Sequence, residues 1–458
     1  MTTHVAVIDV GKTNVKLVLV DRESLSEIAL VTRPNTVLPG PPWPHFDVEG
    51  HWAFLLDGLR AFHAAHGIDA ISVTTHGASA ALLDREGRLA APVLDYEFAG
   101  PDDLAAEYDA LRPAFRETGS PRLAGGLNVG AQLHWQFRTD PGLRERTHRI
   151  VTYPQFWGAR LTGVAATDVT SLGCHTDLWN PRAGTFSSLV ETLGIADIMA
   201  PVHRPSDVLG PVLPQIAELT GLAPDTPVLC GIHDSNASLL PYVEAERAPF
   251  SVVSTGTWVI ALSIGGAGGT LDPERDTLIN VTAHGRPAPS ARFMGGREHD
   301  LATGGACPEP TESDLSDVLA GGIMLLPAVV PDSGPFRHRT ARWVGAEPET
   351  GTGRRGAAVA LYLALMTAEC LANIGHAGKI IVEGPFAANR LYLRMLGAAT
   401  GAAVHRSPGR TGTSAGAALL VSGPALPPPS GGEPIRVEDR TAAALRDYAE
   451  RWRRIARS

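Results

Sequence analysis

A turn near the start of the chain carries the residue types that bind phosphate. The stretch Val5–Val20 reads VAVIDVGKTNVKLVLV, in which two apolar, β-branched runs flank a turn and predict a β-hairpin. Glycine lets the backbone of a turn approach a ligand, and turn N–H groups can converge on an anion. Asp9 would repel a bare phosphate but suits one that arrives with Mg²⁺, because hard cations take oxygen ligands. We therefore expect Asp9 to hold Mg²⁺. The residues expected to bind phosphate are Gly11, Lys12, Thr13, Asn14 and Lys16.

Lysine is rare in this chain and is concentrated in this turn. It occurs only at Lys12, Lys16 and Lys379, although 39 residues are lysine or arginine. A single turn of this kind is equally typical of an edge hairpin with solvated charges. Two of the three lysines in one hairpin favour the phosphate site.

A carboxylate follows an apolar run in the middle of the chain. Pro227–Ile232 predicts a buried strand, and it leads directly into His233, Asp234 and a helix start of small residues. A carboxylate at a strand end can act as a general acid or base, and we expect Asp234 to do so. The alternative is that Asp234 is only the N-cap of the helix.

Another predicted strand, Ala70–Thr75, ends at His76 and Gly77. In open α/β sheets ligands bind at the carboxyl ends of the strands, so Thr75, His76 and Gly77 are candidates for lining a substrate cleft. From spacing alone, a packing role for His76 is the favoured alternative.

A second strand–turn–strand, Phe250–Leu262, resembles the first. Aligning Gly256 with Gly11 places Ser254 opposite Asp9. Two similar hairpins, each opening one half of the chain, indicate an internal duplication. We expect an N-terminal domain at residues 1–243 and a C-terminal domain at residues 244–458.

The composition is that of a globular protein. With 458 residues the chain is too long for one core, and its 44% apolar and 19% charged content is ordinary. The net charge of −9 argues against a nucleic-acid-binding or membrane-binding surface. Four widely spaced cysteines form neither a disulfide framework nor a zinc motif, which fits the reducing cytoplasm. A strand at the N-terminus, in place of a basic segment and cleavage site, predicts no signal peptide.

Two further segments are predicted to be helices. Gly356–Ala368 is apolar but too short to span a bilayer, so we expect a buried helix. Val437–Ile455 is basic, and we expect a solvated surface helix. The sequence permits a homodimer.

With these residues in view, the chain resembles the FGGY carbohydrate kinases over nearly its whole length, most closely the L-fuculokinase and L-rhamnulokinase branch. Asp9–Lys16 is similar to the first phosphate motif of the family, with Lys12 in place of a small residue. Thr74–Asp84 is similar to the segment that lines the sugar pocket. Gly231–Asp234 is similar to the G-x-H-D motif that carries the catalytic aspartate.

Three later segments extend the resemblance. Ser254–Trp258 resembles the second phosphate motif, and Glu383–Asn389 and Gly412–Ala417 stand where the adenosine-binding loops would be. Two positions depart from the family pattern. Ser79 replaces an aspartate in the sugar pocket, and Pro385 lies in what is usually a glycine-rich turn.

The resemblance implies an α/β fold with two ribonuclease H-like domains of the actin/hexokinase type and an active-site cleft between the domains. It implies ATP and Mg²⁺, with sugar and phosphate bound by the first domain and nucleotide by the second. The further nucleotide-binding residues that it implies are Thr255, Gly256, Thr257, Gly384, Pro385, Asn389, Gly412 and Ser414. The substrate-binding residues that it implies are Thr75, His76, Gly77, Asp95, Gln132, His233 and Asp234.

These features predict a cytoplasmic, ATP-dependent kinase that phosphorylates a primary hydroxyl of a ketose such as L-rhamnulose or L-fuculose, with Asp234 as the general base. One alternative is another FGGY substrate, such as a pentulose, glycerol or another polyol. The other is a non-catalytic ATP-binding switch of the actin or chaperone type, because fold alone does not separate switch from kinase.

Overall fold

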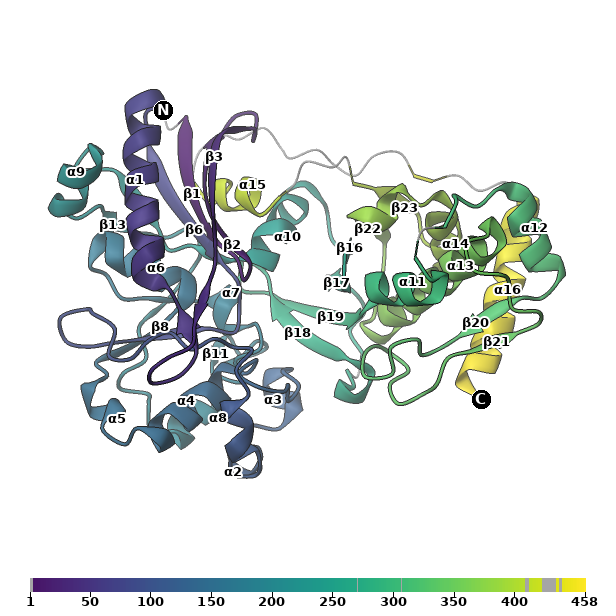
Figure 1. Cartoon of the computed structure of the whole chain (residues 1–458), viewed down its shortest axis with the longest axis horizontal. Helices are drawn as coiled ribbons and strands as arrows, with labels where there is room; N and C mark the ends of the chain where they lie inside the picture. Colours follow the sequence, from purple (N-terminus) through teal and green to yellow (C-terminus); the bar gives the residue numbers. More distant parts are fainter. Residues whose placement is uncertain (1–2, 270, 306, 408–411, 422–433, 436–438) are drawn as a thin grey trace. The chain divides into compact units, whose positions relative to one another are not determined.

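The computed structural model describes residues 3–269, 271–305, 307–407, 412–421, 434–435 and 439–458. The chain divides into two compact units (Figure 1). Unit 1 consists of Met1–Glu244, Ile279–Pro287 and Arg410–Pro428, and unit 2 of Ala245–Leu278, Ala288–Gly409 and Pro429–Ser458. The sequence predicts one continuous segment per domain, whereas in the structure two later segments pack with unit 1.

The main sheet of unit 1 is built around the predicted hairpin. β1 (His4–Val10) pairs antiparallel with β2 (Asn14–Asp21), which pairs with β3 (Glu27–Pro34). On its other side β1 pairs parallel with β6 (Ala70–Thr75). Next to β6 lie β14 (Pro227–Leu229) and β15 (Ile232–His233), both parallel to it, and β13 (Val208–Pro211) forms the far edge.

The other elements of unit 1 are four two-stranded pairs and a set of helices. The pairs are β4 (Val37–Leu38) with β5 (His45–Phe46), β7 (Ala80–Leu83) with β8 (Arg149–Thr152), β9 (Thr167–Asp168) with β12 (Val202–His203), and β10 (Trp179–Asn180) with β11 (Thr185–Phe186). The helices are α1 (Val48–His66), η1 (Gly100–Leu104), α2 (Ala105–Leu111), α3 (Phe115–Thr118), α4 (Val129–Thr139), α5 (Leu143–Arg146), α6 (Tyr153–Thr162), α7 (Val169–Leu172), α8 (Ser188–Thr192), α9 (Pro214–Thr220), α10 (Asp234–Ala245) and α15 (Thr413–Ala418).

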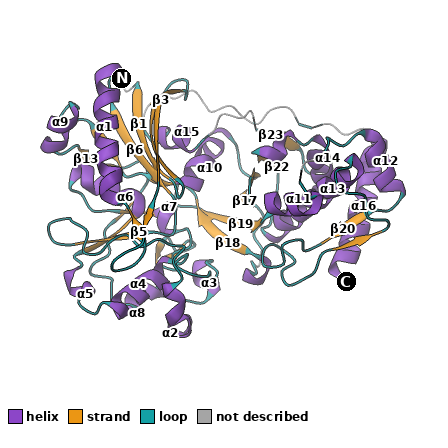
Figure 2. Ribbon diagram, in the orientation of Figure 1, coloured by secondary structure: helices purple, strands orange, loops and turns teal. Residues whose placement is uncertain are grey.

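The two faces of this sheet are covered by different helices (Figure 2). Successive side chains of a strand point to opposite faces. Ala6, Ile8 and Val10 accordingly pack in the core that includes α1 and α6, whereas Val5 and Val7 pack in the core that includes α10 and α15. By the same alternation Asp9 faces the side of α10, whose first residue is Asp234.

Unit 2 repeats this plan. Its sheet has the order β18 (Thr277–Val281), β19 (Pro287–Phe293), β17 (Val259–Ile264), β16 (Phe250–Thr255), β22 (Lys379–Glu383) and β23 (Val404–Arg406). The division into units groups the end of β18 and the first residue of β19 with unit 1. β16 and β17 form the second predicted hairpin, and β16 pairs parallel with β22 as β1 does with β6. The remaining elements are η2 (Pro273–Arg275), α11 (Gly295–Thr303), α12 (Glu312–Ala320), β20 (Met324–Leu326), β21 (Arg342–Val344), α13 (Gly353–Asn373), η3 (Pro385–Ala388), α14 (Arg390–Thr400) and α16 (Asp439–Arg457).

Two helices of unit 2 test the sequence predictions. α13 is long and apolar enough to cross a membrane, but 83% of its most apolar window is buried in the unit, as expected for a core helix. The prediction of a solvated helix at the C-terminus is wrong. Leu445, Tyr448 and Trp452 of α16 are fully buried, and the indole Nε1 of Trp452 donates to the carbonyl of Leu325 (2.7 Å). Val437 lies outside the described residues.

Candidate active site

Three parallel strands of unit 1 end at the same edge of the sheet. Thr74 of β6 is the register partner of both Asp9 in β1 and Ile232 in β15. The backbone N–H of His76 donates to Val10 O (2.9 Å) and continues this alignment past the strand ends. The first turn, the His76–Gly77 segment and Asp234 therefore all leave the sheet at one edge.

Gly231 allows β15 to lie against β6. Its φ is +91°, and a Cβ at this position would stand 2.6 Å from the carbonyl oxygen of Val73. Any other side chain would push β15, and Asp234 with it, away from β6.

The turn between β1 and β2 offers groups that fit a phosphate. The N–H of Gly11 donates to Asn14 O (2.9 Å), and the side chain of Asn35 braces the turn by donating to Gly11 O (2.8 Å). Within the described part of the chain, the N–H groups of Lys12 and Thr13 and the side chains of Thr13 and Asn14 have no hydrogen-bond partner. N–H and hydroxyl groups left open in a glycine-containing turn suit a phosphate.

Asp9 fits a hard cation. Its side chain is buried, and Lys16 is its nearest cation, with Nζ 3.8 Å from Oδ2. Burial, helped by the charge of Asp234 and opposed by that of Lys16, raises the pKa of Asp9 to about 6. Among the described residues no group of three acidic, histidine or cysteine side chains could enclose a metal ion. One carboxylate suits Mg²⁺ that keeps its waters and the phosphates of a substrate as its other ligands.

The carboxylate of Asp234 has one oxygen in use and one open. Oδ1 accepts from the backbone N–H of Ser235 (2.6 Å) and lies 3.1 Å from Nε2 of His233. No group in the described residues donates to Oδ2, and the side chain is 31% exposed. Asp234 is the first residue of α10, and its Oδ1 accepts from the N–H of the next residue and not from an N–H two or three residues further on, as an N-cap would. Oδ2 stays free for a second partner.

His233 is held against Asp234 by its surroundings. Burial acts to lower the pKa of His233, but Cys174 and Asp234 outweigh it and raise that pKa to about 9. Burial likewise opposes ionisation of the Cys174 thiol, whose pKa is nevertheless lowered to about 5 by His175 and His233. A protonated His233 thus forms an ion pair with Asp234, with Nε2 3.1 Å from Oδ1.

The surroundings of Nδ1, the other ring nitrogen of His233, are compatible with a protonated ring once the amide of Asn236 is turned. Nδ1 lies 3.1 Å from the side-chain nitrogen of Asn236, while Oδ1 of Asn236 is buried without a partner among the described residues. Amide oxygen and nitrogen are assigned from the hydrogen-bond network. Turning the amide by 180° lets Oδ1 accept from a protonated Nδ1.

His76 has one buried nitrogen to spare. The carbonyl of Gly77 can only accept, so Nδ1 of His76 carries the proton in their 2.9 Å hydrogen bond and Nε2 is an acceptor. Nε2 is buried and has no partner within the described residues. Burial lowers the pKa of His76 to about 4, so the ring is neutral at pH 7. The ring packs against those of Phe46 and Tyr153, as the packing alternative expects, but packing leaves Nε2 unused.

Other predicted residues of unit 1 have structural roles in the described contacts. The hydroxyl of Thr75 donates to the carbonyl of His76 (2.9 Å), and the amide of Gln132 donates to the carbonyls of Ala78 (2.6 Å) and Gly126. Gln132 therefore fixes the loop after Gly77. The hydroxyl of Ser79, at the position that departs from the family, is buried without a partner among the described residues.

The small-residue helix α15 belongs to unit 1. Gly412 precedes it, and Ser414 is buried in its first turn. The hydroxyl of Ser72 in β6 donates to Ala417 O (2.8 Å), which anchors α15 on the sheet.

The predicted nucleotide residues of unit 2 lie around the second hairpin and the turn after β22. The hydroxyl of Thr255 donates to Glu383 O (2.5 Å) and accepts from the N–H of Phe386 (3.1 Å), so it joins these two segments and is not open to a ligand. Gly256 and Thr257 form the bend of the hairpin, and Thr257 is exposed. Gly384 and Pro385 form the turn that Thr255 holds.

Asn389 lines a cavity of about 200 Å³ in unit 2 together with Thr311, Arg390 and Arg394. Its Oδ1 caps α14 by accepting from the N–H of Tyr392 (3.0 Å). With Oδ1 used in the cap, the amide nitrogen is the group that Asn389 can offer to a ligand in the cavity.

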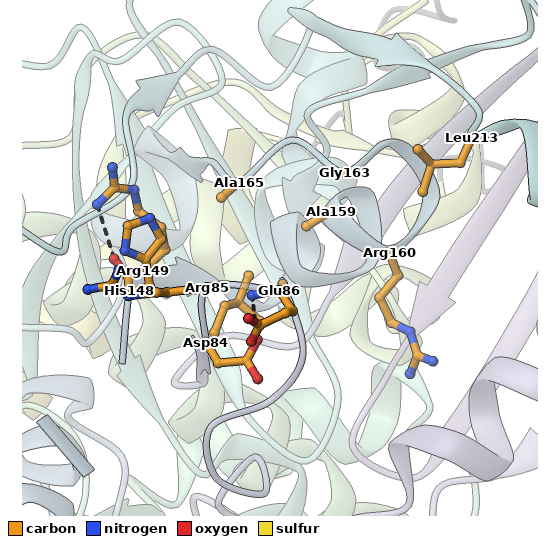
Figure 3. Close-up of a pocket in the computed structure, with 12 residues that line it drawn as sticks. Asp84, Arg85, Glu86, His148, Arg149, Ala159, Arg160, Gly163, Ala165 and Leu213 are labelled. Carbon is orange, nitrogen blue, oxygen red and sulfur yellow. Dashed lines mark hydrogen bonds between the residues drawn. The ribbon is translucent and has the colours of Figure 1, made fainter. Parts of the chain in front are cut away.

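A larger cavity of about 480 Å³ in unit 1 contains none of the individually predicted site residues, although Leu83 and Asp84, at the end of the predicted sugar-pocket segment, line it (Figure 3). It is lined by the turn Asp84–Gly87, by His148 and Arg149, and by the end of α6. Its charged groups are largely paired, because Asp84 bonds Arg88 and Arg160 bonds Glu49. We assign no function to it.

Sequence reasoning missed several residues around the edge of the sheet. Cys174 and Asn236 contact His233, and Glu97 contacts Lys12. The dipeptide Cys174–His175 was the one visible signal, since a thiol next to an imidazole is a common reactive pair. The others depend on contacts between residues far apart in the chain.

Comparisons with known proteins agree with the resemblance. The model for the N-terminal domain of the FGGY family of carbohydrate kinases matches residues 4–241, and the model for the C-terminal FGGY domain matches residues 247–429. The crystal structure of a carbohydrate kinase from Novosphingobium aromaticivorans is 38% identical, with a TM-score of 0.91 over 100% of this chain and 99% of that one. This likeness confirms the predicted actin/hexokinase type of fold.

Curated relatives are more distant. The L-fuculokinase of Escherichia coli K12 is 26% identical over 273 residues, which is 56% of each chain, and the xylulose kinase of the same strain is 22% identical over 257 residues, 55% of this chain and 53% of that one. The match thus spans about half the length of these relatives.

Proposed function

Because this chain belongs to the FGGY family of carbohydrate kinases, we propose that it transfers the γ-phosphoryl group of ATP to a primary hydroxyl of a ketose, with Asp234 as the general base. The proposed substrates are ketoses of the L-fuculose and L-rhamnulose kind, and the proposed location is the cytoplasm. One observation carries the proposal. The phosphate-type turn, His76 and Asp234 leave the same edge of the unit 1 sheet, because β1, β6 and β15 run parallel and in register.

Each group at this edge has a role in phosphoryl transfer, a reaction that asks the protein mainly for positioning and charge stabilisation. The free N–H groups of Lys12 and Thr13 and the side chain of Asn14 would bind phosphate oxygens of ATP. Asp9 would hold Mg²⁺, which neutralises charge on the phosphates when bound. In unit 2, Gly256, Thr257 and Asn389 are proposed nucleotide contacts.

Asp234 would take the proton of the attacking hydroxyl. Because Oδ1 is occupied by Ser235 and His233, the free Oδ2 is the acceptor. The proton moves to Oδ2 as the hydroxyl oxygen bonds to phosphorus and the bond to ADP breaks. General-base assistance of this kind is worth about 10²–10⁴-fold in rate. His233 orients the carboxylate so that Oδ2 faces the substrate.

Two rival functions remain as alternatives. Similarity to xylulose kinases makes a pentulose the second candidate substrate. An ATP-binding switch needs neither the open Oδ2 of Asp234 nor the open Nε2 of His76. These two open acceptors favour the kinase.

A coupled assay of ADP formation tests the proposal. Purified protein is given MgATP and, in turn, L-fuculose, L-rhamnulose, D-xylulose, L-xylulose, glycerol and D-gluconate. We expect ADP formation that depends on a ketose, with one ketose at least about tenfold better in kcat/KM than the rest. Binding of ATP without ADP formation from any of these compounds would contradict the kinase and support the switch.

A further inference from the structure

The side chain of Lys12 turns away from the phosphate-type turn that carries it. Its ammonium nitrogen contacts Oδ1 of Asp95 and lies 3.1 Å from Oε2 of Glu97. The same nitrogen lies 4.9 Å from the ring centroid of Tyr96 and 5.2 Å from that of Phe46, within reach of cation–π attraction. Lys12 is thus held by two carboxylates and two rings, all outside the turn.

These partners are shared with the segment proposed to bind the sugar. The His76 ring lies 5.0 Å from the Phe46 ring and 5.2 Å from the Tyr96 ring. Lys12 and His76 therefore sit on the same two aromatic side chains. This arrangement connects Lys12 to the sugar-binding segment, although the sequence motif assigns it to the phosphates.

The cluster has two open acceptors and one donor. Oδ1 of Asp95 accepts from Lys12 and from the N–H of Glu97 (3.2 Å), while Oδ2 has no donor among the described residues. Nε2 of His76 is the second open acceptor. A sugar hydroxyl both donates and accepts, so adjacent hydroxyls could donate to these two atoms while one of them accepts from Lys12.

We propose that the side chain of Lys12 determines substrate specificity. Together with Asp95 and His76 it binds adjacent hydroxyls of an uncharged sugar, and its ammonium does not bind the phosphates of ATP. This inference rests on the proposed kinase function. The charge of the cluster then selects neutral sugars over sugar acids. One ammonium faces the two carboxylates of Asp95 and Glu97, so the cluster is net negative and would repel the carboxylate of a sugar acid.

Moving Lys12 to a phosphate would also be unfavourable. The Asp95 side chain is only 10% exposed, and withdrawal of the ammonium would leave this carboxylate buried without its counter-charge. Breaking such a pair costs more than its formation contributes. The family's usual small residue at position 12 could make no such contact.

The variant Lys12→Met tests the proposal because it keeps the length of the side chain and removes the charge. Lys379→Met is the matched control, since Lys379 is an ion-paired lysine of unit 2 outside the proposed site. Steady-state assays give KM and kcat for the best ketose, and titration calorimetry gives the Kd of MgADP without sugar. We expect kcat/KM for the ketose to fall about 10–100-fold, as for loss of a charged hydrogen bond. The Kd of MgADP should change less than threefold. The control loses an ion pair of similar burial, so it should keep the kcat/KM and the Kd of the wild type even where its melting temperature falls.

Several outcomes would overturn the inference. A tenfold or greater rise in the Kd of MgADP with an unchanged sugar KM would assign Lys12 to the phosphates. Faster use of D-gluconate than of any neutral ketose by the wild type would refute the charge argument. If Lys12→Met does not fold, Lys12→Arg, which keeps the ion pair but changes its geometry, is expected to alter sugar KM and not MgADP affinity. A wild type that binds MgADP but phosphorylates no sugar would contradict the proposed kinase function itself. That result differs from all those that overturn only the role of Lys12.

Discussion

Gly77 has no room for a side chain next to the group that orients the proposed base. A Cβ at this position would stand 2.8 Å from Nε2 of His233, 3.0 Å from its Cδ2 and 3.6 Å from Sγ of Cys174. Ordinary contacts between such atoms begin near 3.4 Å, so in Gly77→Ala the ring of His233 must move by roughly 0.6 Å.

That movement is large relative to the close contact between His233 and Asp234. A shift of this size away from Asp234 would widen the 3.1 Å ion pair between Nε2 and Oδ1 beyond hydrogen-bonding distance. The carboxylate then loses its orienting partner, and a misplacement approaching 1 Å can cost about 10²-fold in rate. We expect kcat to fall about 10–100-fold. Crowding of this kind lowers the free energy of unfolding by about 1–3 kcal/mol, which leaves the protein folded.

The coupled ADP assay measures kcat, circular dichroism measures the melting temperature, and calorimetry measures MgADP affinity, which should not change. Gly397→Ala is the matched control. Gly397 lies in α14, and its Cβ would make ordinary contacts of 3.5 Å with Val404 and 3.6 Å with the carbonyl oxygen of Ala402. Alanine should stabilise this helix by about 0.5–1 kcal/mol. Wild-type kcat in Gly77→Ala would refute the idea that a fixed His233 positions Asp234.

Three more predictions concern the turn, the open histidine nitrogen and a buried carboxylate. Gly11→Val should abolish MgADP binding in a folded protein, because its Cβ would lie 3.1 Å from Asn14 O within the turn; unchanged calorimetric affinity would remove the phosphate role. His76→Ala should raise the sugar KM at least about tenfold with MgADP affinity unchanged, as expected for loss of a substrate hydrogen bond; a lower melting temperature with the same sugar KM would favour packing alone. Burial raises the pKa of Glu298 in unit 2 to about 7 from 4.5, so native stability falls as pH rises between these values. Glu298→Gln should therefore raise the free energy of unfolding by roughly 3 kcal/mol at pH 8 and little at pH 4.5, and equal effects at both pH values in thermal melts would contradict this.

The fold class could be predicted from local patterns. Both hairpins consist of β-branched runs around a glycine, and each pairs as expected, Val5–Val10 with Val15–Val20 and Phe250–Thr255 with Val259–Ile264. The strand that leads into Asp234 is also as predicted. Patterns of this kind depend on neighbours in the chain, which a single sequence displays.

The partners of the site residues could not be predicted in this way. Lys12 contacts Asp95, 83 residues away, and His233 contacts Cys174. These contacts are set by how β6, β15 and the connecting loops pack, and no periodicity encodes that packing. The motif led us to expect Lys12 at the phosphates, whereas its described contacts are elsewhere.

The C-terminal helix shows a different reason for error. Leu445, Tyr448, Ala449, Trp452 and Ala456 recur at helical spacing and form the buried face of α16. The pattern was present in the sequence, but the many arginines around it suggested a solvated helix. Arginine side chains can cover such a helix while their heads bind acids, as Arg453 binds the buried Glu369 (3.0 Å).

The most direct test of the central claim is the rate of Asp234→Asn. This change keeps the size of the side chain and removes the charge and the basic oxygen Oδ2. With the best ketose and saturating MgATP, we expect kcat to fall about 10²-fold or more, with the melting temperature and MgADP affinity close to those of the wild type. The N-cap alternative expects retained activity, because asparagine caps helices about as well as aspartate. Phosphorylation of the ketose at near the wild-type rate would show that Asp234 is not the base.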